Sequence, residues 1–167
     1  VLQGFLRNPL AEPGLVGISS SASLGAVLAI YTGFSAAFPL GLPLAALAGA
    51  LIAVIVVQAL AGSGGVLTVI LAGVAVSSFA SAMTSLALNL SPNPFAALEI
   101  MFWMLGSLAD RSMTHVWLAT PFIFAGWLML ASLGRSLDAL TLGADAAASM
   151  GVDLNRTRRF AILGTAL

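Results

Sequence analysis

The sequence predicts an all-α fold, a polytopic transmembrane helical bundle, and two properties of the 167-residue chain carry this prediction. Hydrophobic residues make up 60% of the chain and charged residues only 7%, whereas soluble domains carry about 25% charged residues. A small soluble domain leaves much of its surface in water and could not hide this much apolar surface. Several apolar runs also approach the ~20 residues that a helix needs to cross a bilayer.

Short polar or glycine- and proline-rich breaks divide the chain into the predicted spans. Asn8 and Pro9 end the first apolar run, and Pro13 and Gly14 form a turn before the next one. The later breaks are "PLGLP", "GSGG" and "SPNP", each typical of a turn. The predicted spans, in chain order, are residues 1–6 (the tail of a span), 17–38, 44–61, 66–90, 116–133 and 160–167 (the start of a span).

Residues 95–106 are too short to cross and contain Glu99, so they are expected to form a short interfacial or re-entrant helix. Trp103 suits the headgroup level. The chain starts at Val1 and ends in the apolar run "FAILGTAL". We therefore expect one membrane domain over 1–167, incomplete at both ends.

Residues 135–159 form the most polar stretch, which is expected to fold as two short helices in water. Ser136 is the predicted cap of the first helix, and Gly143 is expected to end it. Asp145 starts the second helix, and Gly151 ends it.

The placement of arginine predicts the orientation, because basic residues near span ends favour the cytoplasmic side. All six basic residues are Arg. If 135–159 is cytoplasmic, the alternation of spans puts Arg111 and the 95–106 helix outside. The other five arginines then fall inside: Arg7, Arg135, Arg156, Arg158 and Arg159.

Small residues recur every four positions in two predicted spans. Such stripes let helix backbones approach closely in a membrane. For the span 17–38 they predict a helix-packing face made of Gly17, Ser21, Gly25, Ala29 and Gly33. For the span 66–90 helix packing is the more common meaning, and a mildly polar pathway wall stays open as the alternative for Ser77, Ser81 and Ser85. Pro121 is expected to kink the span 116–133.

Several functions find little support in the residues. The chain has no Cys, its net charge is +0, and no ionisable residue lies mid-span, so Cys-based metal sites, nucleic-acid binding and a proton relay have no candidates. His115 stands alone and is expected to be an interfacial histidine, not a metal ligand. "GSGG" lacks the Lys of a phosphate-binding loop, so any ATP hydrolysis is expected in another chain. We expect no catalytic residue, no metal and no cofactor in this chain.

Four stretches resemble one family in the right order. They are "LQGFLRNPLAEPGLVGISSSASLGA", "ILAGVAVSSFASAMTSL", "FWMLGSLAD" and "LDALTLGADAAASMGVDLNRTRR". Together they resemble the FecCD-type permease of type II ABC importers, which serve iron–siderophore, haem and cobalamin uptake. The resemblance covers essentially the whole chain. It implies a ten-span permease, of which this chain would hold the end of the second span through the start of the seventh.

The resemblance also implies roles for particular residues. The segment 135–159 would be the cytoplasmic coupling loop that docks on the ATP-binding subunit. Gly65 and Val66 would take the positions of a cytoplasmic gate, where the cobalamin member has small hydroxylated residues. The residues matching the docking loop are Leu140, Leu142, Gly143, Ala144, Ala147, Ala148 and Gly151.

The function implied is ATP-driven import of a bulky iron chelate across the bacterial inner membrane by alternating access. A ferric siderophore is the first expectation, with haem or cobalamin as the others. The implied partners are the ATPase, a second permease copy in a homodimer or pseudo-dimer, a periplasmic or lipid-anchored substrate-binding protein, and membrane lipid. The alternative is an ion-coupled secondary transporter or channel subunit, which would need a charged relay outside this chain.

Overall fold

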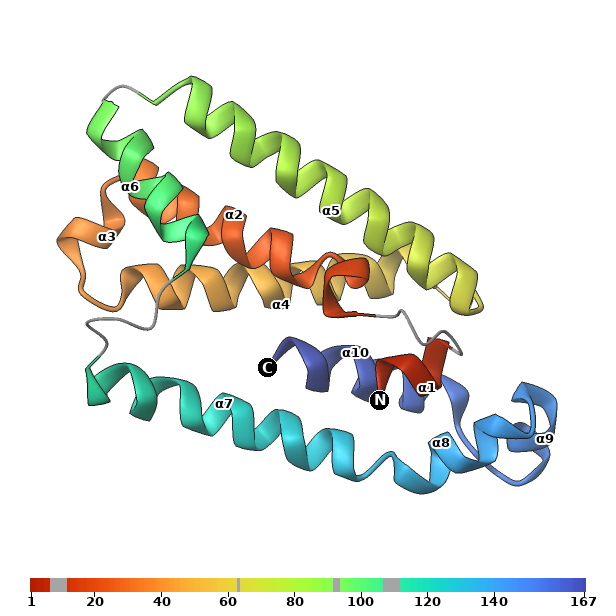
Figure 1. Ribbon diagram of the computed structural model, residues 1–167. Helices are drawn as coiled ribbons and strands as arrows, with labels where there is room; N and C mark the ends of the chain where they lie inside the picture. Colours follow the sequence, from red (N-terminus) through yellow and green to blue (C-terminus); the bar gives the residue numbers. More distant parts are fainter. Residues whose placement is uncertain (7–11, 63, 92–93, 107–111) are drawn as a thin grey trace.

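The computed structural model describes residues 1–6, 12–62, 64–91, 94–106 and 112–167. Within these ranges every regular element is a helix (Figure 1), so the all-α prediction is confirmed. Pro13–Val16 forms a short 3₁₀ helix, η1. The α-helices are α1 (Leu2–Leu6), α2 (Ile18–Tyr31), α3 (Phe34–Ala37), α4 (Gly41–Ala61), α5 (Val66–Asn89), α6 (Pro94–Leu105), α7 (Met113–Ala131), α8 (Gly134–Thr141), α9 (Ala144–Ser149) and α10 (Leu154–Ala166).

Two groups of helices make up the bundle. α2 packs against α4 and α5, while α10 packs against α7 and also reaches α4. The short helices α3 and α6 lie at one end of the bundle, and α8 and α9 lie at the other end (Figure 1). The turn between α4 and α5 is at the α8–α9 end of the bundle.

Among the described residues, three helices are long and apolar enough to cross a membrane by length and composition: Gly41–Ala61, Val66–Asn89 and Met113–Ala131. α4 begins three residues before the predicted start of its span, because Pro43 lies in its first turn. Proline is tolerated there, since the amide that it lacks would have no acceptor within the helix.

The predicted span 17–38 is wrong as a single helix. α2 has 14 residues, which corresponds to about 21 Å of helix, short of the ~30 Å hydrocarbon core. The helix ends at Thr32, whose hydroxyl donates to the Leu28 carbonyl at 2.7 Å. Gly33 follows with φ +75°, a left-handed conformation that breaks the helical hydrogen-bond pattern. Residues 34–37 then form the separate helix α3.

α2 and α4 cross at a pair of glycines. A Cβ added at Gly25 would lie 2.1 Å from the Ala45 carbonyl oxygen, and one added at Gly49 would lie 2.2 Å from the Ser21 carbonyl oxygen. Neither position has room for a side chain, so the two backbones are in direct contact. Gly25 and Ser21 belong to the stripe of small residues predicted from the sequence. Gly49 was not predicted to pack, because it lies in a helix so rich in alanine and leucine that no separate stripe of small residues stands out.

α7 and α10 cross in the same way. A Cβ at Gly126 would lie 2.8 Å from the Gly164 carbonyl oxygen, and one at Gly164 would lie 2.9 Å from a methyl group of Leu130. Small-residue crossings of this kind drive helix association where apolar burial is no different from contact with lipid.

The other members of the predicted packing stripe differ in their surroundings. Ala29 is buried, and a Cβ at Gly17 would lie 3.0 Å from the Gly73 carbonyl oxygen on α5. Gly33 takes no part in close packing, because a Cβ there would meet nothing within 4 Å. Its glycine is explained by the left-handed turn alone.

The serine stripe of α5 is divided between two environments. The Ser77 hydroxyl donates to the Gly14 carbonyl at 3.2 Å and so ties η1 to α5. Ser81 and Ser85 are exposed on this chain. Ser77 therefore has a packing role, and only Ser81 and Ser85 remain available for the predicted pathway wall.

We expect Gly25→Ala to lower the free energy of unfolding by about 1–3 kcal/mol, since the added methyl group forces α2 and α4 apart. The matched control is Gly134→Ala in α8, where a Cβ would meet nothing within 4 Å. That change should be neutral or slightly stabilising, because alanine favours helix over glycine. Thermal unfolding of the purified protein in detergent measures both, and equal effects would contradict the close crossing.

Replacing Ser77 by Ala should lower the free energy of unfolding by about 1 kcal/mol, because the hydrogen bond that ties η1 to α5 is lost while the Gly14 carbonyl keeps only the Gly17 amide as a donor. Ser81→Ala, one turn further along α5, should leave it within about 0.5 kcal/mol of the unsubstituted protein. Thermal unfolding is again the measurement. If Ser81→Ala lowered the free energy of unfolding more than Ser77→Ala, the packing role assigned to Ser77 would be wrong.

Candidate coupling and gate site

The coupling module comprises α8 and α9 together with the turns that follow them. Gly143 ends the first helix with φ +116°, and Gly151 follows the second with φ +84°, as the sequence predicted for both glycines. Asp145 lies in the first turn of α9, where an acidic side chain favours the helix dipole.

Two details of the module differ from the prediction. Ser136 does not cap α8, because the helix begins at Gly134 and Ser136 lies inside it. The last helix begins at Leu154, six residues before the predicted span start at 160. Asp153 is its cap, with a side-chain oxygen accepting from the Arg156 amide at 3.0 Å. Hydropathy does not reveal this helix start, because the first turn of α10 is polar.

One apolar cluster joins the coupling module to the membrane helices. Its buried members come from α1, α8 with its cap residue, α9 and α10, and the first two turns of α5 pack against it through Val66 and Ile70. The buried members are Phe5, Leu6, Leu133, Ala139, Leu140, Ala147 and Ala161. The module is therefore packed onto the bundle and does not hang from it as a free loop.

The predicted docking residues split into an outer and an inner set. Leu142 is 70% exposed, Ala144, Ala148 and Gly151 are exposed, and Gly143 is partly exposed. Leu140 and Ala147 were also predicted at the docking surface, but they are only 7% and 0% exposed and belong to the apolar cluster. They can hold the docking surface in place but cannot themselves form it.

Met150, which the sequence analysis did not single out, is 63% exposed beside Gly151. A large apolar side chain directly before a helix-ending glycine in a polar segment is the signal that could have found it. We call Leu142, Ala144, Ala148, Met150 and Gly151 the docking surface.

The predicted gate lies in a tight turn between α4 and α5. Gly62 has φ +50°, and the Gly64 amide donates to the Ala61 carbonyl at 2.8 Å. Gly65 precedes α5, is exposed, and has no atom within 4 Å of where a Cβ would lie. Val66 is partly buried and packs on the apolar cluster. We call Gly62, Gly64 and Gly65 the gate turn.

Arg158 reaches the gate turn from α10. Its guanidinium donates through Nη1 to the Gly64 carbonyl at 2.8 Å and through Nη2 to the Gly62 carbonyl. The residue is only 7% exposed. The orientation rule predicts for Arg158 only a place on the cytoplasmic side. Its spacing from Leu154, Ala161 and Ile162 puts it on the packed face of α10, and that periodicity could have revealed it.

A cavity of about 480 Å³ lies where these segments meet. It is lined by Gly64, Gly65 and Val66 on one side and by Leu140 and Ala144 of the coupling module on the other, with Arg158 also in its wall. The gate turn and the module are thus neighbours around one space.

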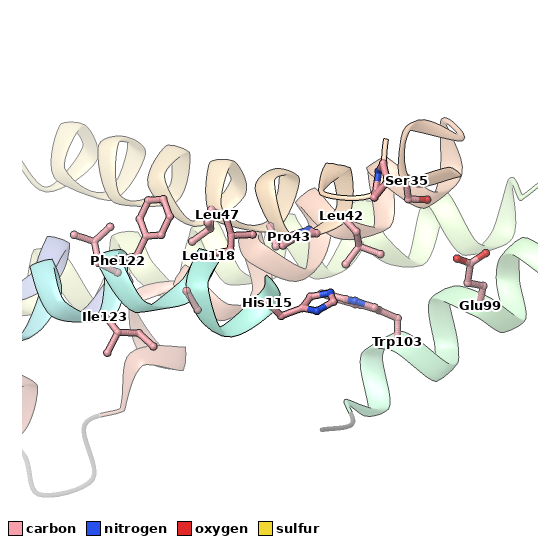
Figure 2. Close-up of a pocket in the computed structure, with 14 residues that line it drawn as sticks. Ser35, Leu42, Pro43, Leu47, Glu99, Trp103, His115, Leu118, Phe122 and Ile123 are labelled. Carbon is pink, nitrogen blue, oxygen red and sulfur yellow. The ribbon is translucent and has the colours of Figure 1, made fainter. Parts of the chain in front are cut away.

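A second cavity, of about 650 Å³, lies at the opposite end of the bundle between α4, α6 and α7 (Figure 2). Glu99 and Trp103 come to it from α6, and His115 comes from the start of α7. The His115 Nδ1 lies 3.0 Å from the Ser112 hydroxyl oxygen. Among the residues that the structure describes, no three His, Cys, Asp or Glu side chains gather into a metal site. The predictions for Arg7, Asn8, Pro9 and Arg111 lie outside the described residues.

Comparison with known proteins places the chain among ABC transporter permeases. It is 35% identical over 99% of its length to the uncharacterized ABC transporter permease protein YvrB of Bacillus subtilis, covering 48% of that protein. It is 38% identical over 95% of its length to the cobalamin import system permease protein BtuC of Halobacterium salinarum, covering 43%. It is 37% identical over 98% of its length to the ferric enterobactin transport system permease protein FepD of Escherichia coli, covering 49%.

The chain therefore spans about half the length of these relatives. A solved metal-chelate type ABC transporter in an inward-facing conformation superposes with a TM-score of 0.84 at 28% identity, over 99% of this chain and 53% of that one. The match to the FecCD transport family extends over residues 1–167. The resemblance found in the sequence is confirmed, and the chain belongs to the FecCD transport family.

Proposed function

We propose that this chain is part of the permease subunit of an ATP-driven importer that moves a bulky metal chelate by alternating access. A ferric siderophore is the first candidate, with haem or cobalamin as the others. The observation that carries the proposal is that the inner residues of the coupling module, beneath the exposed docking surface, share one apolar cluster with Val66, the residue that follows the glycine-rich turn. Membership of the FecCD transport family supports it.

The docking surface would receive the ATP-binding subunit. Leu142 and Met150 supply exposed apolar side chains, and Ala144, Ala148 and Gly151 leave room between them for a partner to approach. Since Leu140 and Ala147 are packed into the apolar cluster, a push on the docking surface would move the module as a body. Val66 and Ile70 would carry that movement into α5.

The permease would then exist in two states, open to opposite sides of the membrane. ATP and the loaded substrate-binding protein would each favour the state with which they make better contacts. No covalent step is required of this chain, because ATP hydrolysis would take place in the partner.

The surroundings of the helices fit a larger assembly. Among the described residues of α7, Gly126 is the one that is buried, so the face of this helix that does not pack on α10 is left to contact lipid, further helices or a second permease copy. We place the coupling module in the cytoplasm of a bacterium and α6 on the periplasmic side. Arg135, Arg156 and Arg159 at the module's end of the bundle favour this orientation.

Uptake into proteoliposomes tests the function. The complete complex of permease, ATPase and binding protein should transport a labelled ferric siderophore only when ATP is present on the side of the membrane that carries the ATPase. An ATPase carrying a substituted phosphate-binding Lys should abolish uptake. Uptake that persists with this inactive ATPase but collapses with a proton ionophore would instead identify an ion-coupled transporter.

Adjacent alanines of α9 separate docking from packing. Ala148→Arg should reduce ATP-dependent uptake at least ~10-fold with little change in the unfolding temperature, because a charge is placed in the docking interface without a partner. Ala147→Arg should lower the unfolding temperature of the permease itself, since Ala147 is 0% exposed. Uptake assays and thermal unfolding measure the two effects. If both variants unfold early, Ala148 does not belong to an outer surface.

A further inference from the structure

Arg158 is a charged residue held away from water without an acidic partner among the described residues. It is 7% exposed, and its hydrogen bonds go to two backbone carbonyls of the gate turn. Burial of a charge is costly unless hydrogen bonds compensate it. A neutral side chain at this site would have avoided that cost. The two hydrogen bonds to the gate turn are therefore the feature that distinguishes arginine from a neutral residue here.

The neighbouring arginines provide a contrast on the same helix. Arg159 is exposed, and Arg156 is exposed with its guanidinium 5.2 Å from the centre of the Phe160 ring. These two exposed arginines are sufficient to keep the segment soluble and to set its orientation in the membrane. Arg158 is the member of the group whose donors reach another element, more than ninety residues away in sequence.

The planar guanidinium suits the two carbonyls because it offers donors in a fixed fork. Both acceptors are backbone oxygens of glycines, so the contact fixes the path of the turn and not the rotamer of a side chain. Nε of Arg158 is buried and has no hydrogen-bond partner among the described residues. One donor of Arg158 is thus unsatisfied in this arrangement of the side chain. A different arrangement that satisfies this donor would therefore cost less free energy than it otherwise would.

α10 also touches the coupling module. α9 contacts α10, and the module's apolar cluster includes Ala161, one turn beyond Arg158. The cavity of about 480 Å³ between the gate turn and the module has Arg158 in its wall. A displacement of the module can therefore reach the gate turn through a single polar contact as well as through apolar packing.

We infer that Arg158 is a positioning residue that holds the gate turn against α10 and couples the position of the turn to that of the coupling module. The inference rests on the proposed function, because the movement is driven by the ATP-binding subunit. It assigns to Arg158 the transmission of that movement to the turn.

Thiol labelling of the gate turn tests this role in the complete transporter complex. This chain has no Cys, and Gly65 has open space around a Cβ, so Gly65→Cys places a thiol in the turn, and the same complex with Gly65 unchanged gives the background labelling to subtract. We expect Arg158→Gln to raise the rate of maleimide labelling of that cysteine in the nucleotide-free complex about tenfold, since hydrogen bonds from a charged donor are lost. Arg158→Lys, which keeps the charge and restores one donor position, should give a smaller increase.

Arg159→Gln is the matched control, because it removes the same charge from the next residue of α10 and should leave the labelling rate unchanged. The second readout is the number of chelate molecules transported per ATP hydrolysed, which should fall for Arg158→Gln while hydrolysis continues. A labelling rate equal to that of the control, or a loss of uptake that only follows the amount of folded complex, would overturn the inference. Should the unsubstituted complex show no ATP-driven uptake, the proposed function would fail, and nucleotide-free labelling would still decide whether Arg158 holds the turn.

Discussion

The direct contact of helix backbones at two glycine pairs is the constraint on which the rest of the structure depends. A Cβ added at Gly25, Gly49 or Gly126 would lie 2.1, 2.2 or 2.8 Å from a backbone carbonyl oxygen of the facing helix, and one at Gly164 would meet the Leu130 side chain. In a bilayer the helices gain nothing by hiding apolar side chains from lipid, so close van der Waals contact must hold them together. Each pair fixes two helices as a unit, and α10 joins the units by packing on α4.

In the proposed function, rigid units of this kind give the coupling module something to act upon. The module is polar outside and apolar inside, and its inner residues share one cluster with the start of α5. A flexible loop would absorb a push from a partner, whereas a packed module transmits it, because a close-packed interior deforms little. The same packing explains why Leu140 and Ala147, expected at the docking surface, lie beneath it.

The sequence predicted what depends on composition and local pattern. The long spans, the glycines that end α8 and α9, and the close packing of Gly25 followed from hydropathy, turn chemistry and four-residue spacing. It failed where hydropathy does not mark a helix boundary, and where a packing partner has to be identified. The break at Gly33 interrupts an apolar run without any change in polarity, and the start of α10 is as polar as a loop. A stripe shows that a helix has a packing face, but it does not identify the helix that meets it.

Arg158 shows why charge is the least readable of these signals. Arginines near a span end satisfy the orientation rule whether they are solvated or buried, so composition gives Arg156, Arg158 and Arg159 the same meaning. Only the helical register separates them, because it turns Arg158 toward Ala161 and Ile162 and leaves Arg159 outside. A buried cation at that register needs acceptors, and the free carbonyls of a glycine turn supply them. The turn has such carbonyls because its tight backbone leaves them outside the helices, so the glycines that make the turn also create the site that Arg158 binds.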